Sequence, residues 1–435
     1  MEQLVLTLIF LGVLFFLLGS GVWVGLSLLG VALVGMELFT SRPVGDAMAT
    51  TIWSASSSWT LTALPLFIWM GEILFRTRLS EDLFKGLSPW LGGLPGRLLH
   101  VNVAGCAIFA AISGSSAATV ATVGKMSIPE LRRRGYPESM IIGTLAGAGT
   151  LGLLIPPSII LIVYGVTVNE SIAGLFMAGV LPGIMLALLF MAYIILRAVL
   201  QPEGMPPREA VVGFVQKVRD SFSLLPVVLL ILAVLGSIYA GIATATEAAV
   251  IGVAGSLIIS ALQGSLTRRS FTESLMGATR TSCMIALILA GANFLSLAMG
   301  FIGLPRDLAA WIGSLELTPL ALIVMLTVFY IILGCFLDGI SAVVLTMAVV
   351  EPMVRQAGID MLWFGIFLVI VVEMAQITPP VGFNLFVLQG MTEHQIPFIA
   401  RAALPMFAIM VLAVVLVVAF PEIATWLPSQ MRRGP

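Results

Sequence analysis

Apolar runs of about twenty residues recur along the whole chain and restrict it to one class of fold. An α-helix of about 20 residues crosses the roughly 30 Å hydrocarbon core of a bilayer. Hydrophobic residues make up 59% of the 435 residues and charged residues only 10%, which excludes a soluble globular enzyme. The sequence therefore predicts an all-α polytopic membrane protein. Ten segments qualify as full crossings: 4–19, 21–39, 60–76, 138–166, 172–197, 223–240, 244–262, 282–302, 361–390 and 401–426.

Two further apolar stretches, 97–131 and 320–354, are each interrupted by a small polar cluster. The clusters are Ser113-Gly114-Ser115-Ser116 and Asp338-Gly339-Ile340-Ser341. The helices on either side of each cluster are too short to span comfortably, so we predict two re-entrant helical hairpins. With that topology, 16 Lys and Arg residues lie on one side and 5 on the other, which makes the first side cytoplasmic. The net charge of −1 gives no indication of a nucleic acid partner.

The two halves of the chain share identities at a constant offset of 223 residues. The matched pairs are Pro129 with Pro352, Gly135 with Gly358, Pro156-Pro157 with Pro379-Pro380, Glu170 with Glu393, and Pro182 with Pro405. Each half holds five crossings and one hairpin, so the second half enters the membrane in the opposite orientation. We therefore predict inverted-topology repeats at 1–200 and 223–435, as in many secondary transporters. A cytoplasmic linker with an amphipathic segment, 201–222, joins them.

A Pro-Pro pair lies within the long span that follows each hairpin. Two prolines remove two backbone donors, so we predict that both helices are broken at the membrane midplane and leave carbonyl groups free. The hairpin tips offer the hydroxyls of Ser113, Ser115 and Ser116, and Asp338 with Ser341. The neutral hydroxyl oxygens of the first tip suit an alkali cation, and an ionised Asp338 in the membrane should face a cavity, a cation or a partner. We therefore predict two sodium sites flanking one substrate site. A packed proline kink is the alternative interpretation.

Other residues carry weaker signals. Glu247 follows Thr244 at the start of a span, which favours a helix-capping role. Glu72 and Glu373 lie within apolar stretches and are equally compatible with packing, ligand contact or proton linkage. Cys106, Cys283 and Cys335 lack metal-ligand spacing and are interpreted as packing residues, and only two histidines are present.

Several motifs resemble the large membrane subunit of tripartite ATP-independent periplasmic (TRAP) transporters. They are ISGSSAATVATVG at 112–124, Ile128-Pro129 with Gly135-Tyr136, Ile155-Pro156-Pro157-Ser158, the Thr-x-Thr-Glu-Ala at 244–248, and Ile377-Thr378-Pro379-Pro380-Val381-Gly382. The resemblance implies an elevator-type importer of organic acids, usually carboxylates, in a bacterial inner membrane and driven by a sodium gradient. It further implies a scaffold formed by spans within 1–76 and 223–302, and a mobile part that carries both hairpins.

The same resemblance places functional residues on this chain. Sodium binding falls on Ser113, Gly114, Ser115, Ser116, Gly149, Thr150, Pro156, Asp338, Gly339, Ser341, Ile377, Thr378 and Pro379. Candidate substrate contacts are Ser116, Thr150, Ser158, Thr378 and Asn384. Sodium is the only ion implied, with no cofactor and no catalytic residue.

The implied partners are a periplasmic substrate-binding protein and a small four-helix membrane subunit. Because the chain lacks an additional block of four spans, we expect that subunit to be a separate polypeptide. Ala245 stands where the family commonly has Pro, which a helix start tolerates.

Two alternatives remain open. An inverted-repeat anion carrier could work without a binding protein, or Glu72, Asp338 and Glu373 could supply a carboxylate pair for an intramembrane enzyme. Sodium-insensitive, non-saturating flux would indicate a channel. The sequence does not distinguish a sugar acid, a C4-dicarboxylate or a keto acid as the substrate.

Overall fold

The computed structural model describes residues 2–207, 213–303, 318–380 and 382–431, and all secondary structure within them is helical. The predicted linker 201–222 includes residues 208–212, which lie outside the described residues, as does Val381 in the second Pro-Pro motif. Among the described residues, seven helices are long and apolar enough to cross a membrane, or eight if the bent pair Val44–Ser56 and Trp59–Phe75 counts as one span.

The first half forms eleven α-helices with breaks at glycine, proline and small polar residues. They are α1 (Glu2–Gly19), α2 (Val24–Phe39), α3 (Val44–Ser56), α4 (Ala63–Phe75), α5 (Leu79–Leu91), α6 (Leu99–Ser113), α7 (Ser116–Arg133), α8 (Glu138–Gly149), α9 (Leu151–Leu154), α10 (Ile159–Val168) and α11 (Ile172–Leu200), with a 3-10 turn at Trp59–Thr62. The predicted hairpin 97–131 corresponds to α6 and α7. The break predicted at Pro156-Pro157, within the span 138–166, separates α9 from α10.

The described part of the second half begins with a short amphipathic helix and continues through longer apolar helices. It contains α12 (Phe214–Ser221), α13 (Leu225–Tyr239), α14 (Ala245–Leu262), α15 (Arg268–Ile302), α17 (Pro319–Gly334), α18 (Gly339–Gln356), α19 (Met361–Gln376), α20 (Phe383–Met391), α21 (Ile396–Ala419) and α22 (Glu422–Met431), with 3-10 turns at Pro202–Gly204 and Phe222–Leu224. The second hairpin corresponds to α17 and α18, and the second break separates α19 from α20.

Capping side chains explain where several helices begin. Thr244 and Glu247 form a reciprocal capping box at the start of α14, which confirms the capping role expected for Glu247. Asp338 accepts hydrogen bonds from the backbone N–H groups of Ile340 and Ser341, both at 3.1 Å, and so begins α18. Gly114 takes the left-handed conformation, with φ of 58°, and ends α6.

Two predicted spans have different bounds in the structure, and one helix was not predicted. The span predicted at 282–302 begins at Arg268, because Thr267 and Ser270 cap a polar first half that a hydropathy criterion excludes. The segment 401–426 is two helices, α21 and α22, which meet at Phe420 and Pro421. Helix α3 was not predicted, because its threonines and serines lower its hydropathy.

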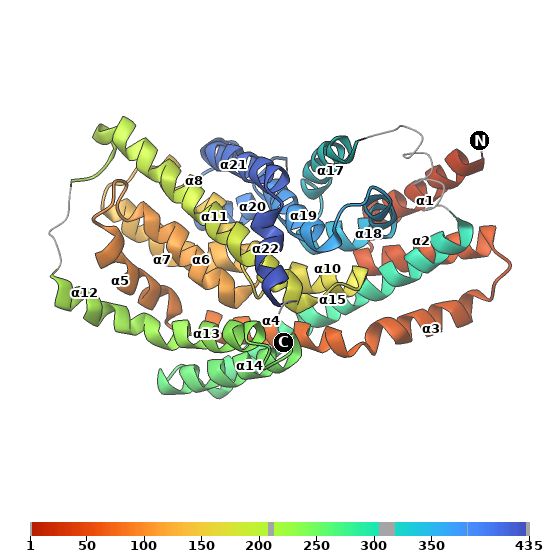
Figure 1. The fold of residues 1–435 in the computed structure, drawn as a ribbon, viewed down its shortest axis with the longest axis horizontal. Coiled ribbons are helices and arrows are strands. Elements are labelled where there is room, and N and C mark those ends of the chain that lie inside the picture. The colour runs from red at the N-terminus through yellow and green to blue at the C-terminus, as the bar shows by residue number, and fades with distance from the viewer. Residues whose placement is uncertain (1, 208–212, 304–317, 381, 432–435) are drawn as a thin grey trace.

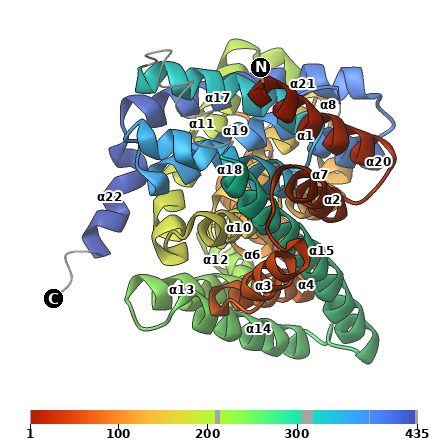
Figure 2. The same ribbon diagram turned by 90° about the vertical axis from the view of Figure 1, so that its right-hand side faces the viewer.

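The helices pack in two layers around a central group, as Figures 1 and 2 show. Helices α13 and α14 lie at the bottom of both views, and α17 and α21 lie near the top. The long helix α15 packs against α2, α3 and α4, whereas α21 packs against α8 and α20 packs against α7. Helices α6, α7 and α10 lie between these layers.

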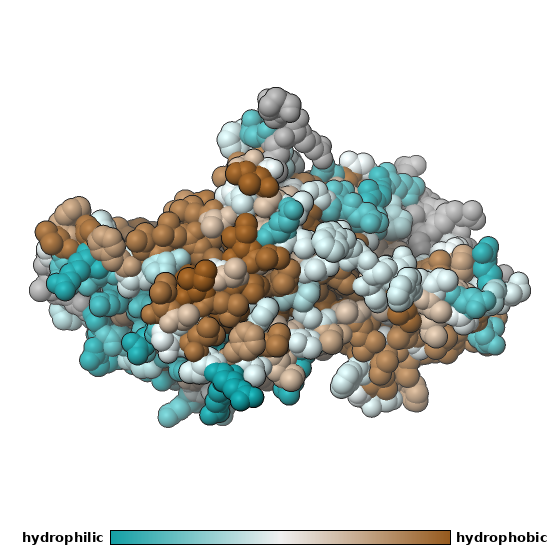
Figure 3. All heavy atoms as spheres, turned by 90° about the horizontal axis from the view of Figure 1, so that it is seen from below, coloured by the Kyte–Doolittle hydropathy of each residue, from teal (hydrophilic) through white to brown (hydrophobic). Residues whose placement is uncertain are grey.

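Large exposed apolar areas cover the outside of the molecule. Figure 3, seen from below, shows extensive brown areas with hydrophilic patches toward their edges. The outward residues of α13 and α14 are apolar, with Leu232 60% exposed and Ile258 59% exposed. An apolar exterior of this extent fits contact with lipid. Cys106 and Cys335 are buried but Cys283 is exposed, so the packing role expected for all three was wrong for Cys283.

Candidate transport site

The tip of the first hairpin packs directly against the first broken helix. A Cβ atom added to Gly114 would lie 2.9 Å from the carbonyl oxygen of Pro157, and one added to Gly152 would lie 2.6 Å from the carbonyl oxygen of Ser115. The N–H group of Ile159 donates to the Gly114 carbonyl at 3.4 Å. The structure thus brings residues 113–116 and 149–159 together, although they are about 40 positions apart in the sequence.

The break leaves backbone carbonyl groups without hydrogen bonds. Within the described part of the chain, no donor reaches the carbonyl oxygens of Ile155, Pro156 and Pro157. Pro156 and Pro157 are buried, and their shared peptide bond is cis. Buried carbonyl groups without partners favour an ion or water beside them.

Hydroxyl groups at the same tip form a short chain of hydrogen bonds. The Ser113 and Thr119 hydroxyls lie 2.9 Å apart, and Thr119 donates to the Ser115 carbonyl at 2.7 Å. The Ser115 hydroxyl accepts from the N–H of Ala118 at the start of α7. These neutral oxygens fit an alkali cation. The described residues contain no cluster of three or more His, Cys, Asp or Glu side chains of the kind that holds zinc or copper.

The tip of the second hairpin contacts the second broken helix in a similar way. The Cys335 thiol lies 3.4 Å from the Pro379 carbonyl oxygen, and a Cβ atom added to Gly334 would lie 2.5 Å from the Ala375 Cβ. No described donor reaches the carbonyl oxygens of Ile377 and Thr378. The Pro379-Pro380 peptide bond is also cis. Gly339 approaches Val372 on α19 and Ile160 on α10, so this tip contacts both broken helices.

A cavity of about 370 Å³ opens beside the first tip. Its walls come from the tip, α20, α4 and α15, and include Ser113, Ser115, Phe383, Glu72 and Thr281. We call it the tip cavity. Its volume falls in the usual range for small-molecule sites, and hydroxyl groups and apolar side chains share its wall.

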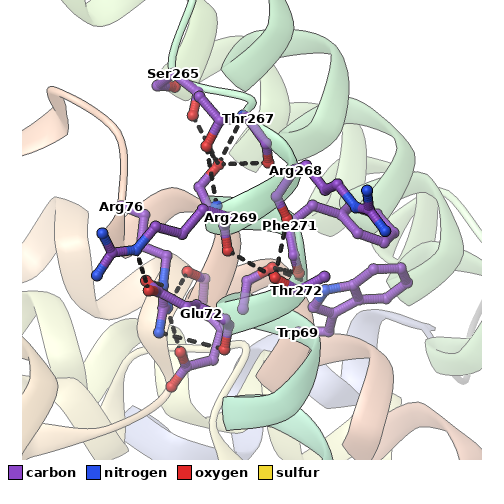
Figure 4. A network of polar contacts seen from close by, with 12 residues as sticks. Trp69, Glu72, Arg76, Ser265, Thr267, Arg268, Arg269, Phe271 and Thr272 are labelled. Atoms are coloured by element: carbon purple, nitrogen blue, oxygen red, sulfur yellow. Dashed lines mark hydrogen bonds and ion pairs between the residues drawn. The ribbon is translucent and has the colours of Figure 1, made fainter.

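A network of charges holds α4 and α15 together next to the tip cavity (Figure 4). Arg76 forms an ion pair with Glu72 and lies 3.9 Å from Glu273, which in turn pairs with Arg269 at 2.7 Å. The Trp69 ring packs edge-on against Phe271, and its N–H donates to the Ser274 hydroxyl at 3.3 Å. The carboxylate of the cavity residue Glu72 is therefore neutralised by a neighbour on its own helix.

Several buried polar groups near the second break lack hydrogen-bond partners. Neither carboxylate oxygen of Glu373 on α19 has one among the described residues, although the Ser116 hydroxyl faces it and only 1% of the residue is exposed. In the same part of the chain, the Asn384 amide, the Gln376 amide nitrogen and the Ser341 hydroxyl are also buried without a described partner. Groups in this state are costly in a membrane and are typical of a site that takes up a polar ligand.

A second, larger cavity lies farther along α15, between this helix and α3. It measures about 690 Å³ and is lined by Thr50, Thr51 and Ser54 of α3, by Asn169, and by Asn293 of α15. We call it the α3 cavity. Its polar wall comes from hydroxyl and amide groups, and none of the described lining residues is charged.

The predicted site residues fall into two groups. Ser113–Ser116, Gly149, Pro156, Gly339, Ile377 and Pro379 lie at the tips and breaks, where free carbonyls gather. The hydroxyls of Thr150 and Thr378 instead donate to carbonyls of their own helices, Gly147 at 2.6 Å and Met374 at 2.7 Å, and the Ser158 hydroxyl donates to Leu153.

Sequence reasoning missed most residues of the tip cavity, among them Thr281 and Phe383. These two side chains come from helices distant in the sequence from the first hairpin, so no local pattern could have shown that they line the same cavity.

The chain resembles a known protein family and a solved transporter structure over most of its length. The family model "Tripartite ATP-independent periplasmic transporter, DctM component" matches residues 11–423. The C4-dicarboxylate TRAP transporter large permease protein DctM of Pseudomonas aeruginosa is 32% identical over 88% of this chain and 89% of its own. The isethionate TRAP transporter permease protein DctMQ of Oleidesulfovibrio alaskensis is 33% identical over 94% of this chain and 63% of its own. The crystal structure of the Alcanivorax borkumensis YdaH transporter superposes with a TM-score of 0.65 at 14% identity, covering 95% of this chain and 98% of its own.

The family match and the relatives named as permeases, together with at least seven helices of spanning length among the described residues, define a multi-pass transporter of the inner membrane rather than an enzyme. The chain belongs to the DctM family, the large permease component of TRAP transporters, as the resemblance indicated.

Proposed function

We propose that this permease imports an organic acid, a carboxylate, and that a sodium gradient drives the import. The observation that carries the proposal is the pairing of each hairpin tip with a broken helix whose carbonyls have no described donor. Oxygens of unwound helices at this depth are the groups that coordinate sodium in transporters built from inverted repeats. The equivalent placement of Pro156-Pro157 and Pro379-Pro380 supports such a repeat.

Sodium, as the co-transported ion, would be held by the free carbonyls and by the tip hydroxyls. At the first tip these are the carbonyls of Ile155 and Pro156 together with the hydroxyls of Ser113 and Ser115. At the second tip they are the carbonyls of Ile377 and Thr378. Asp338 already accepts two backbone N–H groups with one oxygen, which leaves its other oxygen available for an ion.

The organic acid would bind in the tip cavity. The N-terminus of α7, capped by Ser115, and that of α10, which begins at cavity residue Ile159, present positive helix ends there. Hydroxyls of Ser113, Ser115 and Thr281 can donate to a carboxylate, while Phe383 and Val387 cover its apolar part. Two relatives are named as transporter permeases for C4-dicarboxylate and for isethionate, which are small anions.

Transport would follow an elevator movement, in which the hairpins and broken helices shift against α4, α13, α14 and α15. A periplasmic binding protein would deliver the acid, and a small four-helix subunit on a separate chain would complete the membrane part. The charge network between α4 and α15 supports a rigid scaffold, because it ties two of these helices at their ends.

The test of the sodium sites compares melting temperatures in NaCl and in KCl at equal ionic strength. A ligand that binds only the folded state stabilises it by about 2.7 kcal/mol at a hundred times its Kd. We expect Ser115→Ala and Asp338→Ala to lose the sodium-specific stabilisation. Ser171→Ala and Asp360→Ala are matched controls, since Ser171 and Asp360 also cap helices but lie away from the breaks.

The need for both partners and for the sodium gradient is tested by measuring uptake into liposomes that contain the permease, its small subunit and the binding protein. Uptake that needs both partners and an inward sodium gradient supports the proposal. Uptake without the binding protein contradicts the tripartite assignment. Equal stability in NaCl and KCl with all subunits present contradicts sodium coupling and directs attention to proton coupling through Glu373.

A further inference from the structure

A small pocket separate from both cavities lies where α8, α11 and α21 meet. It measures about 140 Å³ and shares no residue with the tip cavity or the α3 cavity. Its polar wall comes from Ser139 and Thr144 of α8, Tyr193 and Arg197 of α11, and Arg401 of α21. At ~30 Å³ per water molecule, the volume suits one phosphate group with a few waters.

Both arginines of this pocket are without an acidic partner among the described residues. No carboxylate of the described residues pairs with Arg197 or Arg401. The nearby acid Glu138 is already paired with Arg132 at 2.5 Å and contacts His394 at 3.3 Å. Two unpaired guanidinium groups at one pocket create a local excess of positive charge that attracts an anion.

Two neutral hydroxyl groups add hydrogen-bond donors to the pocket. The Ser139 and Tyr193 hydroxyls have no hydrogen-bond partner among the described residues, so both can donate to an oxygen of an anion. The Thr144 hydroxyl, in contrast, already donates to the Met140 carbonyl at 2.6 Å. Two guanidinium forks with two free hydroxyls match the several acceptor oxygens of a phosphate group.

Apolar side chains that face outward flank the pocket. On α11, Leu196 is 57% exposed and Leu200 69% exposed, and on α21, Leu404 is 63% exposed. Both helices are long and apolar enough to span a bilayer, so these side chains face acyl chains. In the topology predicted from the sequence, Arg197 ends the span 172–197 and Arg401 begins the span 401–426, both on the cytoplasmic side where headgroups lie.

We propose that this pocket binds the phosphate of an anionic phospholipid, with its acyl chains along Leu196, Leu200 and Leu404. Basic pockets between membrane helices on the cytoplasmic side have the chemistry that recognises such headgroups. A lipid held there would join α11 to α21 in the bilayer. The inference does not depend on the transported substrate or on the coupling ion.

The experiment measures binding of phosphatidylglycerol to the purified, delipidated protein by native mass spectrometry. Each arginine near an anionic headgroup contributes about 1 kcal/mol, which corresponds to about a fivefold change in affinity. We expect Arg197→Gln and Arg401→Gln each to weaken binding about fivefold and the double variant about thirtyfold. Arg268→Gln, which removes an exposed arginine on the same predicted side outside the pocket, should bind as the native protein does.

Two further probes distinguish a lipid from a free anion. Phosphatidylcholine with the same acyl chains should bind much more weakly, and inorganic phosphate should not displace phosphatidylglycerol at equal concentration. An unchanged affinity in the double variant overturns the proposal, as does equal binding of phosphatidylcholine. Displacement by inorganic phosphate alone would instead make the pocket a soluble-anion site. Because both arginine side chains are exposed, the variants should fold, and their melting temperatures without lipid check this.

Discussion

Replacing Gly114 with Ala tests whether the first hairpin tip must touch the broken helix. Gly114 has a φ of 58°, and an added Cβ would lie 2.9 Å from the Pro157 carbonyl oxygen and 3.2 Å from the Ile159 nitrogen. The left-handed conformation costs a residue with a Cβ about 1–2 kcal/mol. Forcing an atom into a packed contact costs a further 1–3 kcal/mol or so.

Gly135→Ala separates these two costs. Gly135 has a φ of 80°, and an added Cβ there would have no neighbour within 4 Å. This control therefore carries the conformational cost without the contact. We expect Gly114→Ala to be less stable than Gly135→Ala by about 1–3 kcal/mol.

The assay is unfolding of both variants in the same detergent, followed by tryptophan fluorescence, in NaCl and in KCl. Because the Gly114 contact borders the free carbonyls of Ile155 and Pro156, Gly114→Ala should also reduce stabilisation by sodium. Gly135→Ala should keep it. Equal destabilisation in the two variants would show that the tip does not press on the break, and the site described above would be wrong.

Three further predictions concern stability. Tyr164→Phe should lower the free energy of unfolding by about 1–3 kcal/mol, because the buried Tyr164 hydroxyl donates to the Met361 carbonyl at 2.7 Å. Tyr239→Phe should change it little, because the Tyr239 hydroxyl lies 3.5 Å from the Phe176 carbonyl. Equal effects of the two substitutions in thermal unfolding would contradict this prediction. Thr244→Ala should cost about 1 kcal/mol by removing the cap of α14, against less than about 0.5 for exposed Thr279→Ala in mid-helix. Arg76→Gln should lower the free energy of unfolding by at most about 1 kcal/mol, because the ion pair of Arg76 with Glu72 is partly exposed and solvent screens it. A larger loss in melting experiments would contradict this prediction.

Local sequence patterns predicted the helical class, the interruptions at Ser113–Ser116 and Asp338–Ser341, and the two Pro-Pro breaks. These features follow from residue types alone, because proline lacks a donor and small polar residues end apolar helices. The pairing of each tip with its break was expected from the repeat, and the contacts of Gly114 and Cys335 show the proximity.

The composition of the cavities could not be read from the sequence. Glu72 and Thr281 lie on α4 and α15 and meet at the tip cavity across more than 200 positions. The sequence also could not show that Thr150 and Thr378 donate to their own helices, since any hydroxyl in an apolar run can do so or bind a ligand.

The two cavities lie at different positions along helix α15, so their separation can be measured along its axis. Thr281 lines the tip cavity and Asn293 lines the α3 cavity, and twelve residues of helix at 1.5 Å each place them about 18 Å apart along its axis. That interval is more than half of the roughly 30 Å hydrocarbon thickness. Rotation of a side chain moves its end by only a few ångströms. In the proposed elevator movement, a displacement of whole helices would carry a solute over most of this distance.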